Sequence, residues 1–234
     1  MTETITPEPR YNALVTALSY LEENNIEVSA DLRLRVRRLT VKAEGDLGGI
    51  SATYHDAITG ALIRYFEGST VTGPRNQFRQ GVTESFYDAF YLGWSDGGGT
   101  FPISQDALDW LTTRVNEEFG HVDGLFQNAK ELRKEDGFDF FSWINDRADA
   151  YSQTLRSIYN AGVMLAKRGM MLTWQLGNTK THCPTCQKLN GQKHRGSWYV
   201  SRNYIPGLPG AAMQCGGYNC DCKLITDKGE VVTL

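Results

Sequence analysis

All five cysteines of this chain of 234 residues lie in its last quarter. They occupy positions Cys183, Cys186, Cys215, Cys220 and Cys222. Cysteines placed by chance would rarely gather in this way, so their clustering indicates a shared chemical role. An odd number of cysteines in a chain without a signal peptide argues against a framework of disulfides.

The spacing of these cysteines predicts one metal ion, and zinc is the expected metal. Cys183-Pro-Thr-Cys186 is a C-x2-C knuckle, whose turn directs two thiolates at a common centre. A structural zinc site takes four Cys or His ligands in a tetrahedron, commonly as two pairs from two turns. We expect four of the five cysteines to bind the ion. Cys215 and Cys220 would complete the site, with Cys222 as the spare thiol or substitute.

Neighbouring residues bear on this site. Gly216 and Gly217 give the second group freedom to turn, because glycine adopts positive φ at little cost. His182 and His194 are reserve ligands.

Two other functions are compatible with clustered cysteines. C-P-T-C has the spacing of a thioredoxin-type redox motif, which belongs after a strand and at the start of a helix. The glycine that follows closely at Gly191 argues against a long helix there. Zinc deaminases pair P-C-x-x-C with an upstream H-x-E, and this sequence contains no H-x-E.

Charge and hydropathy limit the classes of protein to which the chain can belong. The formal net charge is −3, which argues against a general nucleic-acid binder. Residues 171–234 carry seven Lys or Arg and three Asp or Glu, a net of +4, so residues 1–170 carry −7. No apolar run is long enough for a transmembrane helix, and the N-terminal segment lacks the apolar core of a signal peptide. We therefore expect the chain to be made and folded in a cytoplasm.

Helical periodicity dominates the first 170 residues. Helices are predicted from Tyr11 and from Ser29, although Leu32, Leu34 and Val36 alternate with arginines and would also fit a strand. The second segment carries a basic run, Arg33 to Lys42. That run is either a solvated helix face or a face for DNA or an acidic partner. Further apolar stripes predict helices over 50–66, 76–94, 104–119 with a kinked continuation over 120–136, and 138–168. The stripe of the last helix includes Phe141.

The character of the chain changes after Gly169. Short strands are predicted over 171–176 and 197–200, with a hairpin over 222–232 that turns at Asp227-Lys228-Gly229. So small a unit has little core of its own, and a closed zinc site can contribute roughly 10–16 kcal/mol of folding free energy. We predict a mainly α fold with two parts, a helical body over 1–170 and a small zinc-stabilised β/loop module over 171–234.

Several motifs in the C-terminal part follow one another in order. They are Tyr159-Asn160-Ala161-Gly162, Thr173-Trp174, His182-Cys183-Pro-Thr-Cys186-x2-Leu189-x-Gly191, Ser197-Trp198, a Pro/Gly loop and Cys215-Gly-Gly-Tyr-Asn-Cys220-Asp-Cys222-x-Leu224. This set resembles the C-terminal module of the phage Mu F-like head morphogenesis proteins over roughly residues 150–225. Many members of that family carry H-P-N-C-R-C near the end. This chain differs from them, with Cys215 near the histidine position and Asp221 in place of the arginine.

The resemblance implies a structural minor head protein of a tailed bacteriophage. Such a protein would lie in the virion head, associated with the portal or inner capsid, and would act in head morphogenesis or in DNA packaging or ejection. Its partners would be the portal protein, the major capsid protein or both, with packaged DNA as a further partner. It would occupy the host cytoplasm during assembly, bind no membrane or small-molecule substrate, and not be an enzyme.

Two alternatives from other classes stay open. The first is a zinc-module DNA-binding protein, in which Lys188, Lys193 and Arg195 contact phosphates beside the aromatic side chains of Trp198 and Tyr199. The second is a metal-dependent enzyme. The sequence has neither H-E-x-x-H nor G-x-S-x-G, and the carboxylates between 136 and 149 fit a solvated helix surface better than a catalytic group.

Overall fold

The computed structural model describes residues 46–100, 103–178, 181–208, 211–217 and 220–232. The helices predicted from Tyr11 and from Ser29, and the basic run Arg33 to Lys42, lie outside the described residues.

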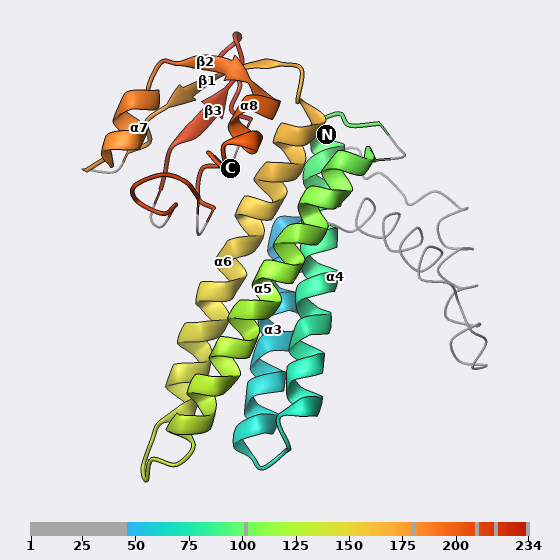
Figure 1. Ribbon diagram of the computed structural model, residues 1–234, viewed down its shortest axis with the longest axis vertical. Coiled ribbons are helices and arrows are strands. Elements are labelled where there is room, and N and C mark those ends of the chain that lie inside the picture. The colour runs from blue at the N-terminus through green and yellow to red at the C-terminus, as the bar shows by residue number, and fades with distance from the viewer. Residues whose placement is uncertain (1–45, 101–102, 179–180, 209–210, 218–219, 233–234) are drawn as a thin grey trace, which may run out of the picture. The chain divides into compact units, whose positions relative to one another are not determined.

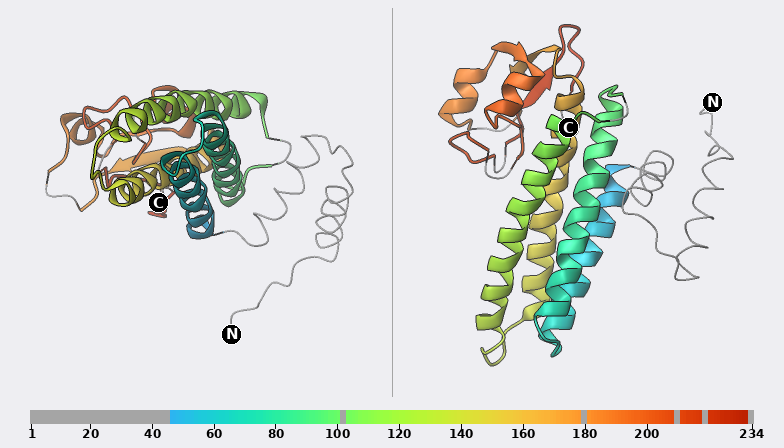
Figure 2. Two further views of the ribbon diagram at one scale, coloured as in Figure 1. Left: turned by 90° about the horizontal axis from the view of Figure 1, so that it is seen from below. Right: turned by 45° about the vertical axis from the view of Figure 1, so that its right-hand side comes forward.

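Four long helices run side by side as a bundle (Figures 1 and 2). They are α3 (Leu47–Phe66), α4 (Thr72–Asp96), α5 (Gln105–Leu132) and α6 (Phe140–Ala166). The predicted mainly α fold is confirmed. The predicted kink near Gly120 is wrong, because α5 is one unbroken helix through that residue. None of the described helices combines the length and apolarity needed to cross a lipid bilayer.

Helices α4 and α6 make the closest contact in the bundle, because glycines let their backbones approach. A Cβ atom at Gly93 of α4 would overlap the carbonyl oxygen of Tyr159, and a Cβ at Gly162 of α6 would overlap that of Phe90. Around this contact the aromatic side chains of α4, Phe78, Phe86, Phe90 and Trp94, are buried. Phe78, Phe86 and their neighbours therefore serve the core.

Phe141 does not belong to the buried stripe of α6, so this prediction is wrong. Its side chain is 55% exposed. Phe140 takes the inward position instead and stacks on Phe66 of α3 with ring centroids 5.2 Å apart. Asp139 caps the helix by accepting a hydrogen bond from the Ser142 N–H, so Phe141 lies in the first turn. Further along α6, Ile144, Ala148 and Leu155 are buried at helical spacing, so the departure from the prediction is confined to the start of the helix.

A three-stranded antiparallel sheet lies at the C-terminal end of α6 (Figure 1). Strand β1 (Met171–Gln175) is central, between β2 (Lys193–Arg195) and β3 (Lys223–Ile225). Leu172 and Trp174 of β1 are fully buried on one face, as expected for alternating residues of a strand. The predicted division at residue 170 falls in the turn between α6 and β1.

The hairpin predicted over 222–232 is confirmed. The Thr226 N–H donates to the Glu230 carbonyl at 2.9 Å, and the Val232 N–H donates to the Leu224 carbonyl at 2.7 Å. Inside the turn, the Thr226 hydroxyl oxygen accepts from the N–H groups of Lys228 and Glu230. Gly229 takes positive φ, so the predicted turn residue has the role that glycine fills best.

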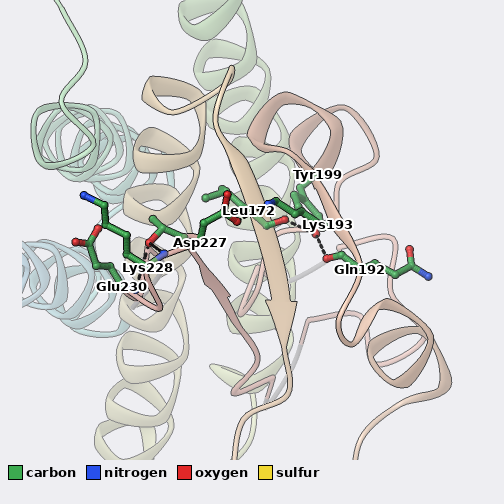
Figure 3. Close-up of polar contacts among 8 residues, drawn as sticks. Leu172, Gln192, Lys193, Tyr199, Asp227, Lys228 and Glu230 are labelled. Atoms are coloured by element: carbon green, nitrogen blue, oxygen red, sulfur yellow. Dashed lines mark hydrogen bonds and ion pairs between the residues drawn. The ribbon is translucent and has the colours of Figure 1, made fainter.

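The strand predicted over 197–200 is wrong, because this segment forms the short helix α8 (Gly196–Ser201). Tertiary packing outweighs the strand propensity of Trp-Tyr-Val here. Tyr199 points beneath the sheet, where its hydroxyl lies 3.2 Å from the Leu172 carbonyl oxygen and 2.9 Å from that of Gln192 (Figure 3). Burial raises the pKa of Tyr199 to about 12, so the hydroxyl stays a donor to these carbonyls.

The C-terminal module is joined to α6 through close backbone contacts. A Cβ at Gly196 would lie 2.7 Å from the Met164 carbonyl oxygen and 2.9 Å from that of Lys167, so only glycine fits without displacement. Asn160 is fully buried, with Nδ2 3.5 Å from the Pro206 carbonyl oxygen. Helix α6 thus supplies both a bundle core and a platform for the module.

Candidate metal centre

Three separate segments bring the cysteines together. Cys183 is the N-cap of the short helix α7 (Pro184–Leu189), and its sulfur accepts a hydrogen bond from the Cys186 N–H at 3.4 Å. Pro184 suits the first helical position because it lacks an N–H that would otherwise need a partner. Cys215 lies in a turn, and Cys220 and Cys222 lie just before β3.

The five sulfurs form one cluster composed of two overlapping groups. Cys183, Cys186 and Cys215 form the first group, and Cys186, Cys220 and Cys222 form the second, with ligand atoms within 4.8 Å of one another in each. Cys186 is common to both groups. The structure therefore unites all of the predicted ligands, and neither His182 nor His194 belongs to either group.

Distances between the sulfurs fit a shared metal ion better than a disulfide. The Cys183 and Cys186 sulfurs are 3.4 Å apart, and those of Cys186 and Cys220 are 3.9 Å apart. Four thiolates in a tetrahedron at 2.3 Å from zinc would be separated by about 3.8 Å. A disulfide bond spans about 2.05 Å, and all five cysteines are free.

The surroundings of the five thiols lower the pKa of two of them and raise the pKa of the other three. Burial raises the pKa of the Cys183 thiol, but the N–H groups of Cys186 and Cys215 outweigh this and lower it to about 7. The pKa of Cys222 is lowered, first by its hydrogen bond with the Cys220 side chain.

The other three thiols resist ionisation. Burial and the neighbouring sulfurs raise the pKa of Cys186, and burial raises that of Cys215. The pKa of Cys220 is raised first by its hydrogen bond with Cys222 and then by burial. Several buried thiolates repel one another, and a bound cation relieves that repulsion, so this donor set is suited to a soft divalent metal.

Two tight backbone crossings hold the cluster in place. A Cβ at Gly177 would overlap the carbonyl oxygen of Asp221, whose carboxylate accepts from the Asn178 N–H at 3.0 Å. A Cβ at Gly217 would overlap the Leu208 carbonyl oxygen, and Gly217 has a φ of +79°. The predicted need for glycine at 216 and 217 is thus explained by positive φ at both, together with this close approach.

Sequence reasoning assigned no role in the cluster to three residues beside it, Gly177, Met213 and Asp221. Gly177 and Asp221 fix the path of the chain beside Cys222, and the Met213 sulfur lies 3.9 Å from that of Cys186. The position of Asp221 between Cys220 and Cys222 could have indicated that it lies beside the cluster. Gly177 and Met213 are near the cysteines in the sequence, but neither residue type marks a metal site by itself.

Of the predicted nucleic-acid contacts, the structure brings two together. Lys193 and Arg195 line a surface hollow of about 560 Å³ beside β2, together with His194 and Trp198. Lys193 also forms an ion pair with Asp227 at 2.5 Å (Figure 3). Lys188 is exposed on α7 and is not part of this hollow.

One wall of the hollow is an aromatic and cationic stack. The rings of His194 and Trp198 are parallel, with centroids 3.6 Å apart. The Arg202 guanidinium carbon lies 4.3 Å from the centre of the Trp198 ring. Stacked planar groups of this kind are found both in structural cores and on surfaces that bind nucleobases.

The fold and the cluster define a mainly α protein with a small C-terminal sheet and a cysteine cluster that could hold a metal ion. Comparison of the chain with protein-family models, curated proteins and solved structures finds no match.

Proposed function

We propose that the cysteine cluster is a closed structural zinc site. Four of the five thiolates would bind one zinc ion, with Cys222 as the spare thiol. The observation that carries this proposal is the sulfur spacing of 3.4 and 3.9 Å, close to that of a tetrahedral thiolate site. Zinc would add stability to a module whose own core is small.

Metal content of the purified full chain tests this site. We expect one zinc ion per chain by elemental analysis and native mass spectrometry. The four bound thiols and the buried Cys222 should all be protected from a thiol reagent in the native protein. Iron bound by four thiolates would be coloured, so a colourless protein distinguishes zinc from iron. A chain that retains no metal, with all thiols reactive, would contradict the proposal.

For the whole chain we propose a minor head protein of a tailed bacteriophage, present in the virion head and associated with the portal or capsid protein. Support comes from the positions of the motifs that resemble the F-like head proteins. Gly162 lies at the α4–α6 contact, Asn160 at the junction with the module, and Trp174 in the core of the sheet. The cysteines lie in the cluster. Asn160, Trp174 and the cysteines thus build the module or hold it to α6, and Gly162 packs α6 against the bundle.

Quantitative mass spectrometry of purified heads tests this role. In the tailed phage that encodes the chain, we expect a few copies per prohead or mature head. Deletion of the gene should block head assembly or DNA delivery. A Cys186→Ser copy should fail to restore infection, and the matched Cys222→Ser copy should restore it. Absence of the chain from both proheads and mature heads would contradict the role.

A second candidate is contact with single-stranded nucleic acid, favoured by the hollow beside β2. Lys193 and Arg195 supply positive charge there, next to the stack of His194 and Trp198. The ion pair of Lys193 with Asp227 weakens this candidate, because it leaves Arg195 as the main phosphate contact.

Salt dependence of oligonucleotide binding tests this candidate. Each phosphate contact to a single strand adds about 0.7 to the slope of log affinity against log salt. Arg195→Gln should therefore lower the slope by about that amount, while Arg156→Gln, an exposed site on α6, should leave it unchanged. Equal slopes in all three proteins would exclude the hollow as a nucleic-acid site.

A further inference from the structure

A second pocket lies in the helical bundle, at the loop between α3 and α4. It has a volume of about 410 Å³ and draws residues from three helices and the loop. Its polar lining includes Ser69, Thr70, Arg75, Asp123, Lys130 and Arg133. We call it the α3–α4 pocket. None of the cysteines lines it.

Positive charge exceeds negative charge in this pocket. Arg75, Lys130 and Arg133 face a single carboxylate, Asp123, so the lining carries three cations and one anion, a net of +2. Asp123 is already engaged by Arg79, whose Nη2 donates to both carboxylate oxygens at 2.7 and 2.6 Å.

The Arg75 side chain is therefore only loosely paired. Its Nη1 lies 3.9 Å from Asp123, at the limit of an ion pair. Its Nε is buried and has no hydrogen-bond partner among the described residues. The exposed part of the Arg75 guanidinium can therefore donate to acceptor oxygens of a ligand in the pocket at closer range than it approaches Asp123.

The opposite side of the pocket holds its cations in place. The Arg133 guanidinium carbon lies 5.1 Å from the centre of the Tyr65 ring. Its Nη1 is 3.5 Å from the Ser69 carbonyl oxygen. Val71, which also lines the pocket, is the N-cap residue of α4 and makes no side-chain cap, so the helix field at this end also favours an anion.

We propose that the α3–α4 pocket binds a phosphate group, either as free phosphate or as an organic phosphate. A phosphate monoester carries about −1.5 to −2 charges near neutral pH, which matches the excess of +2 in the lining. Guanidinium groups bind its oxygens through paired hydrogen bonds. The volume suits a small ligand, and the rings of Tyr65 and Phe126 offer a wall for an organic part.

Calorimetric titration of the full chain with inorganic phosphate and with phenyl phosphate tests the proposal. Ionic strength is held constant with chloride. The variants are Lys130→Gln and Arg133→Gln, which change exposed side chains and should leave the fold intact, and the matched control is Arg156→Gln, exposed on α6 outside the pocket. We expect saturable binding that each pocket variant weakens by about tenfold, the loss typical of one charge-assisted hydrogen bond. The control should bind like the original chain.

Two results would overturn the proposal. One is the absence of saturable binding for both phosphates. The other is equal weakening in Arg156→Gln and in the pocket variants, since that would show an effect of net charge alone. If phenyl phosphate binds more tightly than inorganic phosphate, its ring contacts the aromatic wall and the ligand is an organic phosphate. If the two bind with equal affinity, the ligand is the free phosphate ion. Either assignment supports the site.

Discussion

Replacement of Gly162 by alanine tests the contact on which the bundle depends. A Cβ at Gly162 would overlap the Phe90 carbonyl oxygen, lie 2.9 Å from the Trp94 nitrogen and 3.2 Å from the Gly93 carbonyl carbon. All three are backbone atoms of α4, so no side-chain rotation can relieve the overlap. Helices α4 and α6 would have to separate over their closest contact.

The expected cost follows from two opposing effects. Overpacking of a well-packed core costs typically 1–3 kcal/mol, and a clash with rigid backbone belongs at the upper end of that range. The better helix propensity of alanine returns at most about 1 kcal/mol. We expect a net loss of about 2 kcal/mol, which for a protein of this size lowers the melting temperature by roughly 4–8 °C.

Gly124 provides a matched control on α5. It is also a helical glycine, but no atom lies within 4 Å of the position that its Cβ would take. Gly124→Ala should therefore stabilise the chain by about 0.5–1 kcal/mol, a change of the opposite sign.

Thermal unfolding followed by circular dichroism, at saturating zinc, measures both variants. Metal is kept constant because ligand binding alone shifts the apparent stability. If Gly162→Ala melted at or above the original temperature, or if both variants shifted alike, the reasoning from the α4–α6 contact would be refuted.

Two further predictions concern the cluster and the bundle. Cys186→Ser should abolish metal binding in native mass spectra, because Cys186 belongs to both sulfur groups. Cys222→Ser should keep the metal. Equal loss of metal in both variants would show that Cys222 is a ligand. Burial raises the pKa of Glu118 from 4.5 to about 7, with a smaller opposing effect of Arg114. The folded state therefore binds the proton more tightly than the unfolded state, so stability is greatest below pH 4.5 for this group and falls as pH rises to 7. Glu118→Gln should remove this fall and gain up to about 3 kcal/mol at pH 8, measured by urea unfolding from pH 5 to 8. A variant with the same pH dependence as the original chain would contradict it.

The long helices of the bundle could be predicted from the sequence because their signal is local. The apolar stripe over 50–66 corresponds to α3 at Leu47–Phe66, and that over 138–168 to α6 at Phe140–Ala166. Residues three and four apart share one face of a helix, so burial leaves a periodic record in the sequence. At the start of α6, Phe140 and not Phe141 turns inward because it stacks on Phe66 of α3, a contact that periodicity alone could not reveal.

The candidate metal centre could be predicted as a set of residues but not as an arrangement. Thiol chemistry makes cysteine conspicuous, and clustering in a short segment is visible without a fold. Which backbone crosses beside each sulfur depends on contacts between distant segments. Two such contacts are those of Gly177 with Asp221 and of Gly217 with Leu208. Neither contact produces a periodic pattern in the sequence from which it could be predicted.

By itself the sequence determined the long helices of the bundle, the set of clustered cysteines and the hairpin at Asp227-Lys228-Gly229. Each follows from periodicity, side-chain chemistry or turn preference over a few residues. Only the tertiary structure decided that residues 197–200 form a helix. There the burial of Tyr199 beneath the sheet outweighs strand propensity. The tertiary structure also decided that Gly162 joins two helices and that Arg75 shares a pocket with Lys130 and Arg133. These features depend on which surfaces meet, and burial and steric exclusion between distant segments settle that only when the chain folds.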